Sequence, residues 1–441
     1  MKTLSTFQLV LIAGFIFIAI VAVLIFSGIL PGFRTPSGGT GGEVVMWGTA
    51  DAKRLSPFIE QLNQANQKSF TLRYVQLAPS ALEAEYVTAL ADSVGPDLML
   101  APQDFVFTQG SRLLAWPYES LPLRTFQDSF VAGSETLYLA KDGVLALPIA
   151  LDPLVLYYNR TALTNAGIVN PPTTWTELLA MVPRLTALDA ARNITQSAIA
   201  LGAYGNIRLA KDVMAMLMLQ AGTPIIERTE QGLAPRFTSQ NSSVLSPAAA
   251  ALDFFAQFSD PARVSYTWNR SLPEARAAFA QGQAVFYLGY GSEYEGLRLQ
   301  NPHLDFDLTL LPRKERNARV FLGRFTAVGV ARGSKNPQTA YQVASILALP
   351  ENALQVATAL GLTPAAKSTL AAGTSNTVET IRYQAAIGAR AWYDFDPSGS
   401  ERIFKTMIES VTTGRSTATE AATAAGKEFE ELIKTRYGSG Q

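Results

Sequence analysis

The chain has 441 residues, 48% of them apolar, and its 36 basic residues are balanced by 36 acidic ones. At roughly 100–200 residues per domain, this length predicts two lobes, and the missing basic excess argues against a nucleic-acid binder. The absence of cysteine excludes disulfides, thiol nucleophiles and zinc–thiolate sites, and His303 is the only histidine. We therefore expect neither a cofactor nor a metal ion.

The first thirty residues contain a long uncharged segment. From Leu9 to Leu30 every residue is apolar or small, and a helix of roughly 20 such residues crosses the hydrocarbon core of a membrane. Lys2 precedes the segment and Arg34 is the next charge, so we expect residues 1–8 to stay inside the cell. The sequence thus predicts a single-pass protein of the cell membrane, with its body on the extracellular or periplasmic side.

Two other interpretations of this segment fit less well. A cleaved signal peptide has an apolar region of about 7–15 residues and a small-x-small cleavage site, and Ser27-Gly28-Ile29 matches such a site poorly. A lipoprotein signal needs a cysteine. We expect a permanent anchor over residues 9–30, followed by a flexible Gly-rich tether over residues 31–42.

The body opens with strands that alternate with helices. Strands are predicted at 43–48, 70–75 and 95–100, with helices at 53–67 and 81–92 between them. This alternation predicts a mostly parallel sheet. Ligands bind beyond the carboxyl ends of the strands in such sheets, which places Trp47 to Asp51 and Ala101 to Asp104 at one edge.

A long extended segment follows these alternating elements. The extended run 146–159 contains Pro148 and Pro153, which is typical of a strand passing between lobes. Thr174 and Glu177 have the spacing of a capping box at a helix start. The remaining predicted elements are helices at 211–221, 247–257, 272–281 and 338–349, strands at 284–289 and 325–330, and C-terminal helices separated at Gly414.

Several short segments occur in a characteristic order along the body: Gly95-Pro96-Asp97 to Asp104, Ala146 to Arg160, Ala166-Gly167-Ile168, Pro171 to Leu178, Ala278 to Ala284, Leu310-Leu311-Pro312, Gly333 to Pro337, and Thr413 to Ser416 with Glu420. Together, over about residues 43–436, they resemble family 1 extracellular solute-binding proteins of ABC transporters, the maltose-binding-protein-like family.

The resemblance implies an α/β fold of the type II periplasmic-binding-protein kind. Two discontinuous lobes are joined by a hinge, and the ligand lies in the cleft between them. The N-terminal lobe would comprise residues 43–149 and 306–362, and the C-terminal lobe residues 150–305 and 363–441.

The candidate ligand residues lie at predicted strand ends or at positions that resemble the family's cleft segments: Trp47, Asp51, Asp104, Asp152, Tyr158, Tyr204, Tyr290, Ser292, Glu293, Arg324, Trp392 and Asp394. Five of them have a structural alternative. Trp47 can pack in the core, Asp51 and Asp104 can cap helices, and Asp152 can form a hinge turn. Arg324 can bind an acidic ligand or pair with a surface carboxylate. Tyr157 and Tyr158 alternate along a strand, so at most one of them faces the gap.

Carboxylates and aromatic faces suit sugars, because carboxylates accept hydroxyl hydrogen bonds and rings cover C–H surfaces. We expect an uncharged mono- or oligosaccharide as ligand, ABC permease subunits as partners and no catalytic residues. A surface sensor or adhesion module with the same fold stays open. So does a glycoside-acting enzyme that uses Asp104 and Asp152 as its carboxylate pair.

Overall fold

The computed structural model of the chain describes residues 42–229, 231–238, 245–314 and 319–438. The expected anchor at 9–30 and nearly all of the expected tether lie outside these residues. Within them, no single helix has the length and apolar character needed to cross a membrane; one pair of helices, bent by 77° at residues 348–349, passes by length and composition alone.

The amino-terminal part of the body forms the predicted parallel sheet. Strand β1 (Gly42–Gly48) lies between β2 (Phe70–Gln76) and β3 (Leu98–Pro102), with Trp47 opposite both Val75 and Met99. Helices α2 (Ala52–Asn66), α3 (Leu82–Ala91) and α4 (Gln103–Gln109) follow the three strands. The α/β alternation expected from the sequence is therefore confirmed, and the carboxyl ends of β1 and β3 are neighbours.

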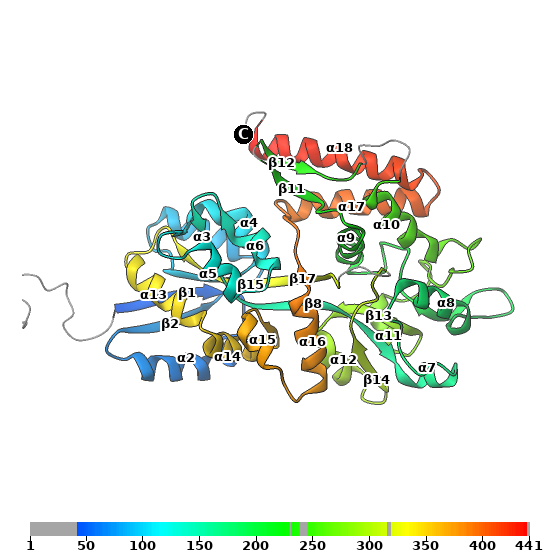
Figure 1. Cartoon of the computed structure of the whole chain (residues 1–441), viewed down its shortest axis with the longest axis horizontal. Coiled ribbons are helices and arrows are strands. Elements are labelled where there is room, and N and C mark those ends of the chain that lie inside the picture. Colours follow the sequence, from blue (N-terminus) through cyan, green and yellow to red (C-terminus); the bar gives the residue numbers. More distant parts are fainter. Residues whose placement is uncertain (1–41, 230, 239–244, 315–318, 439–441) are drawn as a thin grey trace, which may run out of the picture.

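Two long strands run through both halves of the molecule (Figure 1). Strand β8 (Leu147–Asn159) is the predicted crossing strand, and β15 (Phe321–Ala331) pairs with it antiparallel, with Arg324 opposite Asp152. At one end β15 joins β3; at the other, β8 joins β13 (Ala284–Tyr290) and β14 (Phe306–Thr309). The main sheet therefore continues from one half into the other.

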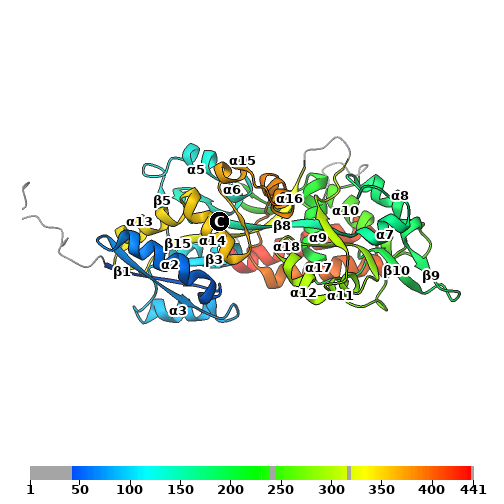
Figure 2. The same cartoon turned by 90° about the horizontal axis from the view of Figure 1, so that it is seen from below.

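The buried side chains form two hydrophobic clusters. The first cluster contains residues from Val44 to Leu151 and from Phe325 to Ala391, and the second contains residues from Leu154 to Leu322 and from Ala385 to Phe429. The clusters meet on β8 at residues 152–153 and on β15 at residues 323–324. Figures 1 and 2 show the resulting elongated body, with helices around each half of the central sheet.

Most of the remaining elements surround these two clusters: β4 (Leu113–Leu114), β5 (Trp116–Pro117), α5 (Leu123–Ser129), α6 (Gly133–Tyr138), β6 (Leu139–Ala140), β7 (Gly143–Val144), α7 (Arg160–Asn165), α8 (Trp175–Leu185), β9 (Ala187–Leu188), β10 (Ile194–Ile199), α9 (Ala210–Ala221), β11 (Ile226–Thr229), β12 (Gly232–Pro235), α10 (Pro247–Ala256), α11 (Ala275–Ala280), α12 (Glu293–Gln300), α13 (Pro337–Leu347), α14 (Pro350–Leu360), β16 (Thr363–Pro364), α15 (Lys367–Ala372), α16 (Thr377–Ile387), β17 (Ala389–Arg390), α17 (Pro397–Thr412) and α18 (Ala418–Tyr437).

One predicted capping contact and one predicted helix start differ from the structure. Thr174 does cap α8 by accepting a hydrogen bond from the Glu177 amide, but the Glu177 carboxylate accepts from Thr173, so the predicted capping box is wrong. Helix α11 begins at Ala275 instead of Leu272, because Glu274 caps it by accepting from the amide of Arg276. Glycine at 414 separates the last two helices as expected, with a φ of 71° that favours glycine.

Candidate functional site

The first predicted edge lies where β1 ends. Gly48 packs so tightly that a Cβ there would lie 2.6 Å from the Leu100 carbonyl oxygen, which explains the glycine. Asp51 is exposed and caps α2, accepting a hydrogen bond from the Lys53 amide at 2.9 Å. Trp47 is half-buried and packs against the first cluster. Asp51 therefore has its alternative role as a helix cap, and Trp47 its alternative role in core packing. Each side chain nevertheless keeps some solvent-accessible surface.

Asp104 lies in the first turn of α4 and is exposed to solvent. No hydrogen bond or ion pair reaches its carboxylate from the described residues. The surrounding protein nevertheless removes much of its hydration, which raises the pKa of Asp104 to about 6; Asp394 also raises the pKa, whereas Lys211 and Arg324 lower it. Since this accessible carboxylate has no partner in the part of the chain that the structure describes, it is free to accept hydrogen bonds from a ligand.

Asp152 is buried on β8 and holds the loop after β13. Its carboxylate accepts hydrogen bonds from the Ser292 amide at 3.0 Å and the Ser292 hydroxyl at 2.5 Å. Burial raises the pKa of Asp152 to about 6, against the lowering effects of Ser292 and of Arg382. Asp152, predicted as a ligand residue with a hinge turn as its structural alternative, therefore ties the crossing strand β8 to the predicted cleft loop.

Glu293 holds the same loop from the other side. It accepts hydrogen bonds from the Tyr290 amide and the Tyr287 hydroxyl, both at 3.0 Å, and forms ion pairs with Arg208 at 3.2 Å and Arg276 at 3.1 Å. With these four partners, Glu293 stabilises the loop rather than presenting a free carboxylate.

Arg324 lies on β15, the strand paired with the crossing strand β8, and links β15 to α9. Its guanidinium pairs with Asp212 at 2.6 Å and lies 4.3 Å above the ring of Tyr290. The arginine side chain is 54% exposed, whereas Tyr290 beneath it is buried. Burial alone would lower the pKa of Arg324, but Tyr290, Asp212 and two further carboxylates outweigh it and raise that pKa. Arg324 therefore has the carboxylate partner that the sequence predicted as its structural alternative, while its side chain also remains accessible.

A second ion pair lies one residue earlier on α9. The Lys211 ammonium lies 2.7 Å from Asp394 and donates to the Ser400 hydroxyl at 2.8 Å. Both charged side chains are largely buried, and one Asp394 oxygen has no hydrogen-bond partner among the described residues. Burial raises the pKa of Asp394, while Lys211 lowers it. Nearby, the Tyr204 hydroxyl donates to Glu401, which is 3.9 Å from Lys211.

The structure therefore brings part of the predicted set together where the two hydrophobic clusters meet. We call this group the boundary cluster; it consists of Asp104, Asp152, Lys211, Asp212, Tyr290, Arg324 and Asp394. The sequence interpretation missed Lys211 and Asp212. The sequence feature that could have identified both residues is their position at the start of a predicted helix, shortly after the glycine-flanked loop that contains Tyr204.

Two other predicted residues lie outside the boundary cluster, one of them next to it. Trp392 is buried in the second hydrophobic cluster, with its ring 5.8 Å from the Lys211 ammonium. Tyr158 is half-buried near Asp307, on the far half of β8. Tyr393, the residue after Trp392, differs from that tryptophan because it packs against both hydrophobic clusters.

Tyr393 belongs to a second contact between the two halves. Its ring lies 4.6 Å from that of Phe107 on α4 and 4.0 Å from the Arg228 guanidinium on β11. Arg228 also donates a hydrogen bond to the Leu139 carbonyl at 2.8 Å. Since Leu139 packs on the first hydrophobic cluster and Tyr393 on both, this contact joins the halves away from the crossing strands.

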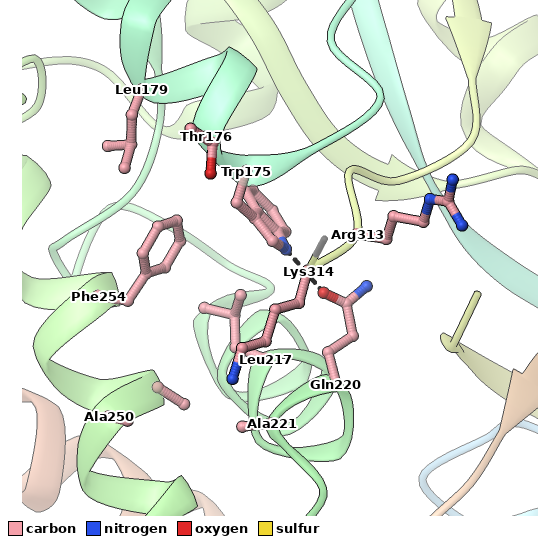
Figure 3. A pocket seen from close by; sticks show the side chains of 11 residues that line it. Trp175, Thr176, Leu179, Leu217, Gln220, Ala221, Ala250, Phe254, Arg313 and Lys314 are labelled. Atoms are coloured by element: carbon pink, nitrogen blue, oxygen red, sulfur yellow. Dashed lines mark hydrogen bonds between the residues drawn. The ribbon is translucent and has the colours of Figure 1, made fainter. Parts of the chain in front are cut away.

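A cavity of about 420 Å³ lies elsewhere, between α8, α9 and α10 (Figure 3). It contains none of the predicted site residues and is lined by Trp175, Thr176, Leu179, Leu217, Gln220, Ala221, Ala250, Ala251, Phe254, Arg313 and Lys314. No group of three or more potential metal ligands is found in the described part of the chain.

Comparison with known families places this geometry in context. Residues 58–382 match a family model described as bacterial extracellular solute-binding protein. A binding protein of Brucella abortus (strain 2308) is 21% identical over 334 residues, which cover 73% of this chain and 76% of the relative.

Solved structures share the fold at low sequence identity. A cyclic alpha-maltosyl-1,6-maltose binding protein from Arthrobacter globiformis superposes with a TM-score of 0.74 at 17% identity, covering 90% of this chain and all of that one. A cyclo/maltodextrin-binding protein in complex with maltotetraose gives 0.73 at 15% identity, covering 92% and 100%. An ABC transporter solute-binding protein from Thermotoga lettingae bound to alpha-D-tagatose gives 0.63 at 18% identity, covering 89% and 100%. The two-lobed α/β architecture is common to all of them.

Proposed function

Because the chain belongs to the family of bacterial extracellular solute-binding proteins, we propose that it captures a carbohydrate between its two lobes and delivers it to the permease subunits of an ABC importer. The similar structures named above include proteins that bind maltodextrins and tagatose. These similarities support a carbohydrate as the ligand class. We also propose that residues 9–30 hold the protein at the membrane by one uncleaved helix.

The boundary cluster is the observation that carries this proposal. Asp104, which packs with the first half of the molecule, has an open carboxylate. Lys211 and Asp212 extend from α9 in the second half, and their charges act on Asp104. Polar groups from both halves therefore converge on one region, as an inter-lobe ligand requires.

Sugars suit this mixture of groups. Carboxylate oxygens accept hydrogen bonds from hydroxyls, while guanidinium and ammonium groups donate to hydroxyl oxygens. The charges are already partly paired within the protein, as in Arg324 with Asp212 and Lys211 with Asp394. This pairing limits the net charge offered to the ligand, which favours a neutral polyhydroxylated compound.

Closure would be a shift of population between open and closed forms. A ligand that contacts both halves stabilises only the form in which the halves approach each other. We place the hinge at residues 152–153 of β8 and 323–324 of β15, because both strands pass there from one hydrophobic cluster to the other. Asp152 would then couple hinge geometry to the loop at Ser292.

A thermal-shift screen of the full chain in detergent, with a panel of mono- and oligosaccharides, tests the proposal. A ligand that binds only the folded state raises the unfolding temperature. The expected result is a shift with one or a few sugars, which are recovered intact after incubation. Released hydrolysis products would instead favour the glycoside-acting alternative, and no shift with any sugar would remove the carbohydrate assignment.

A further inference from the structure

The apolar cavity between α8, α9 and α10 has the dimensions of a small-molecule site. Its volume of about 420 Å³ lies within the roughly 300–1,000 Å³ typical of ligand pockets. Trp175, Leu217 and Phe254 form its larger walls, while Ala221 and Ala250 leave room between the helices (Figure 3).

Two polar side chains in these walls, Trp175 and Gln220, already have hydrogen-bond partners within the protein. The Trp175 indole nitrogen donates to the Gln220 side-chain oxygen at 2.7 Å, and the Gln220 amide nitrogen donates to two backbone carbonyls at 3.1 and 2.9 Å. Trp175 and Phe254 meet edge to face, with ring centroids 5.3 Å apart. Since these groups need no further hydrogen bond, the walls favour an apolar and preferably flat occupant.

The rim of the cavity carries a positive charge. Lys314 extends over the α9 side of the cavity, whereas the Arg313 guanidinium is directed away from it (Figure 3). No acidic side chain is found among the described lining residues, and no ion pair joins Lys314 to a described residue. An ammonium group beside an apolar wall complements an anionic head group on an apolar body.

We propose that this cavity is a second binding site, separate from the inter-lobe region, for a small amphiphile with a flat apolar body and one carboxylate. The body lies against Trp175 and Phe254, and the carboxylate meets Lys314. None of these residues belongs to the boundary cluster, so occupancy here does not depend on carbohydrate capture.

Isothermal titration of the full chain in lipid nanodiscs, with empty nanodiscs subtracted, tests this site. The probes are 2-naphthoate, neutral naphthalene-2-carboxamide and cationic 2-naphthylmethylammonium. We expect 2-naphthoate to bind about two- to fivefold more tightly than the carboxamide, the size of effect that a solvent-accessible ion pair supplies. Lys314→Glu removes this preference and favours the ammonium probe, while Lys405→Glu, at an exposed site on α17, changes nothing.

A second variant tests the cavity itself. Ala250 is exposed on α10, so Ala250→Phe fills the cavity without overpacking the core and abolishes binding of all three probes. Ala424→Phe, at an exposed position of α18, is the matched control. Unchanged binding in Ala250→Phe, or no saturable binding to the native chain, would overturn the proposal. If Ala250→Phe does not fold, the Lys314 pair decides alone, and sugar-induced thermal shifts in Lys314→Glu report separately on the inter-lobe function.

Discussion

Arg324 on strand β15 pairs with Asp212 on α9 at 2.6 Å. The arginine lies between Leu322, in the second hydrophobic cluster, and Phe325, in the first. This pair thus fixes a helix of the second half against the strand segment where the two clusters meet.

Replacing this arginine separates its charge from its packing. Arg324→Ala leaves Asp212 without its cation and uncovers Tyr290, so we expect a loss of about 1–2 kcal/mol in the free energy of unfolding. We also expect sugar affinity to fall at least about tenfold. Urea denaturation and calorimetric titration measure the two effects. Arg324→Lys keeps the charge and should retain more stability than affinity; equal affinity in all three proteins would show that Arg324 does not contact the ligand.

The buried pair of Lys211 and Asp394 should be sensitive to truncation. Lys211→Met leaves a buried carboxylate without its cation, which costs about 3–5 kcal/mol. Urea denaturation of this variant is compared with that of Lys405→Met, an exposed lysine on α17 for which a change within about 0.5 kcal/mol is expected. Similar stabilities of the two variants would contradict the buried geometry.

Asp152 should make stability depend on pH. Its pKa is raised to about 6 in the folded chain, so between about pH 4 and 6 the folded state binds more protons than the unfolded state. Acidification from pH 7 to pH 5 therefore stabilises the fold through this residue, by about 1 kcal/mol. The measurement is the difference in unfolding free energy between the native chain and Asp152→Asn at the two pH values, and an identical pH response of both proteins would refute it.

Asp104 should make ligand binding depend on pH in the opposite direction. Its ionised carboxylate is the hydrogen-bond acceptor, and its pKa of about 6 means that acidification to pH 5 protonates most of it. We expect sugar affinity to fall about tenfold between pH 7 and pH 5. Asp104→Asn should bind more weakly at pH 7 but with little pH dependence. Asp128→Asn, on the exposed surface of α5, serves as control.

The contact of Arg228 with Leu139 and Tyr393 should hold the halves together. Arg228→Ala removes one inter-lobe hydrogen bond and a cation–π contact, together worth about 1–2 kcal/mol. Small-angle scattering of the variant without ligand should show a larger radius of gyration than that of the native chain. Arg236→Ala removes a salt bridge within the same hairpin and should leave the radius unchanged.

The local elements of the fold follow from the sequence itself. An alternating pattern predicted β2 and apolar runs predicted β1 and β13, while helical periodicity predicted α2 and α9. The paired prolines marked β8 as the crossing strand. Turn chemistry at Gly414 separated the last helices. Such features depend on neighbours within a few residues, so side-chain periodicity and backbone preference are sufficient to predict them.

The site depended on contacts between distant segments. The sequence nominated Asp104, Asp152 and Arg324, but not Asp212, which lies 112 residues from the arginine it pairs with. The sequence nominated Trp392 but not its neighbour Tyr393, yet Trp392 is buried in the second hydrophobic cluster and Tyr393 packs on both clusters. The sequence by itself predicted the long elements, such as β1, β2 and β8, but not shorter ones such as α5 and α12. Only the tertiary structure decided which charges pair, because ion pairs depend on distances that chain folding sets between residues far apart in sequence.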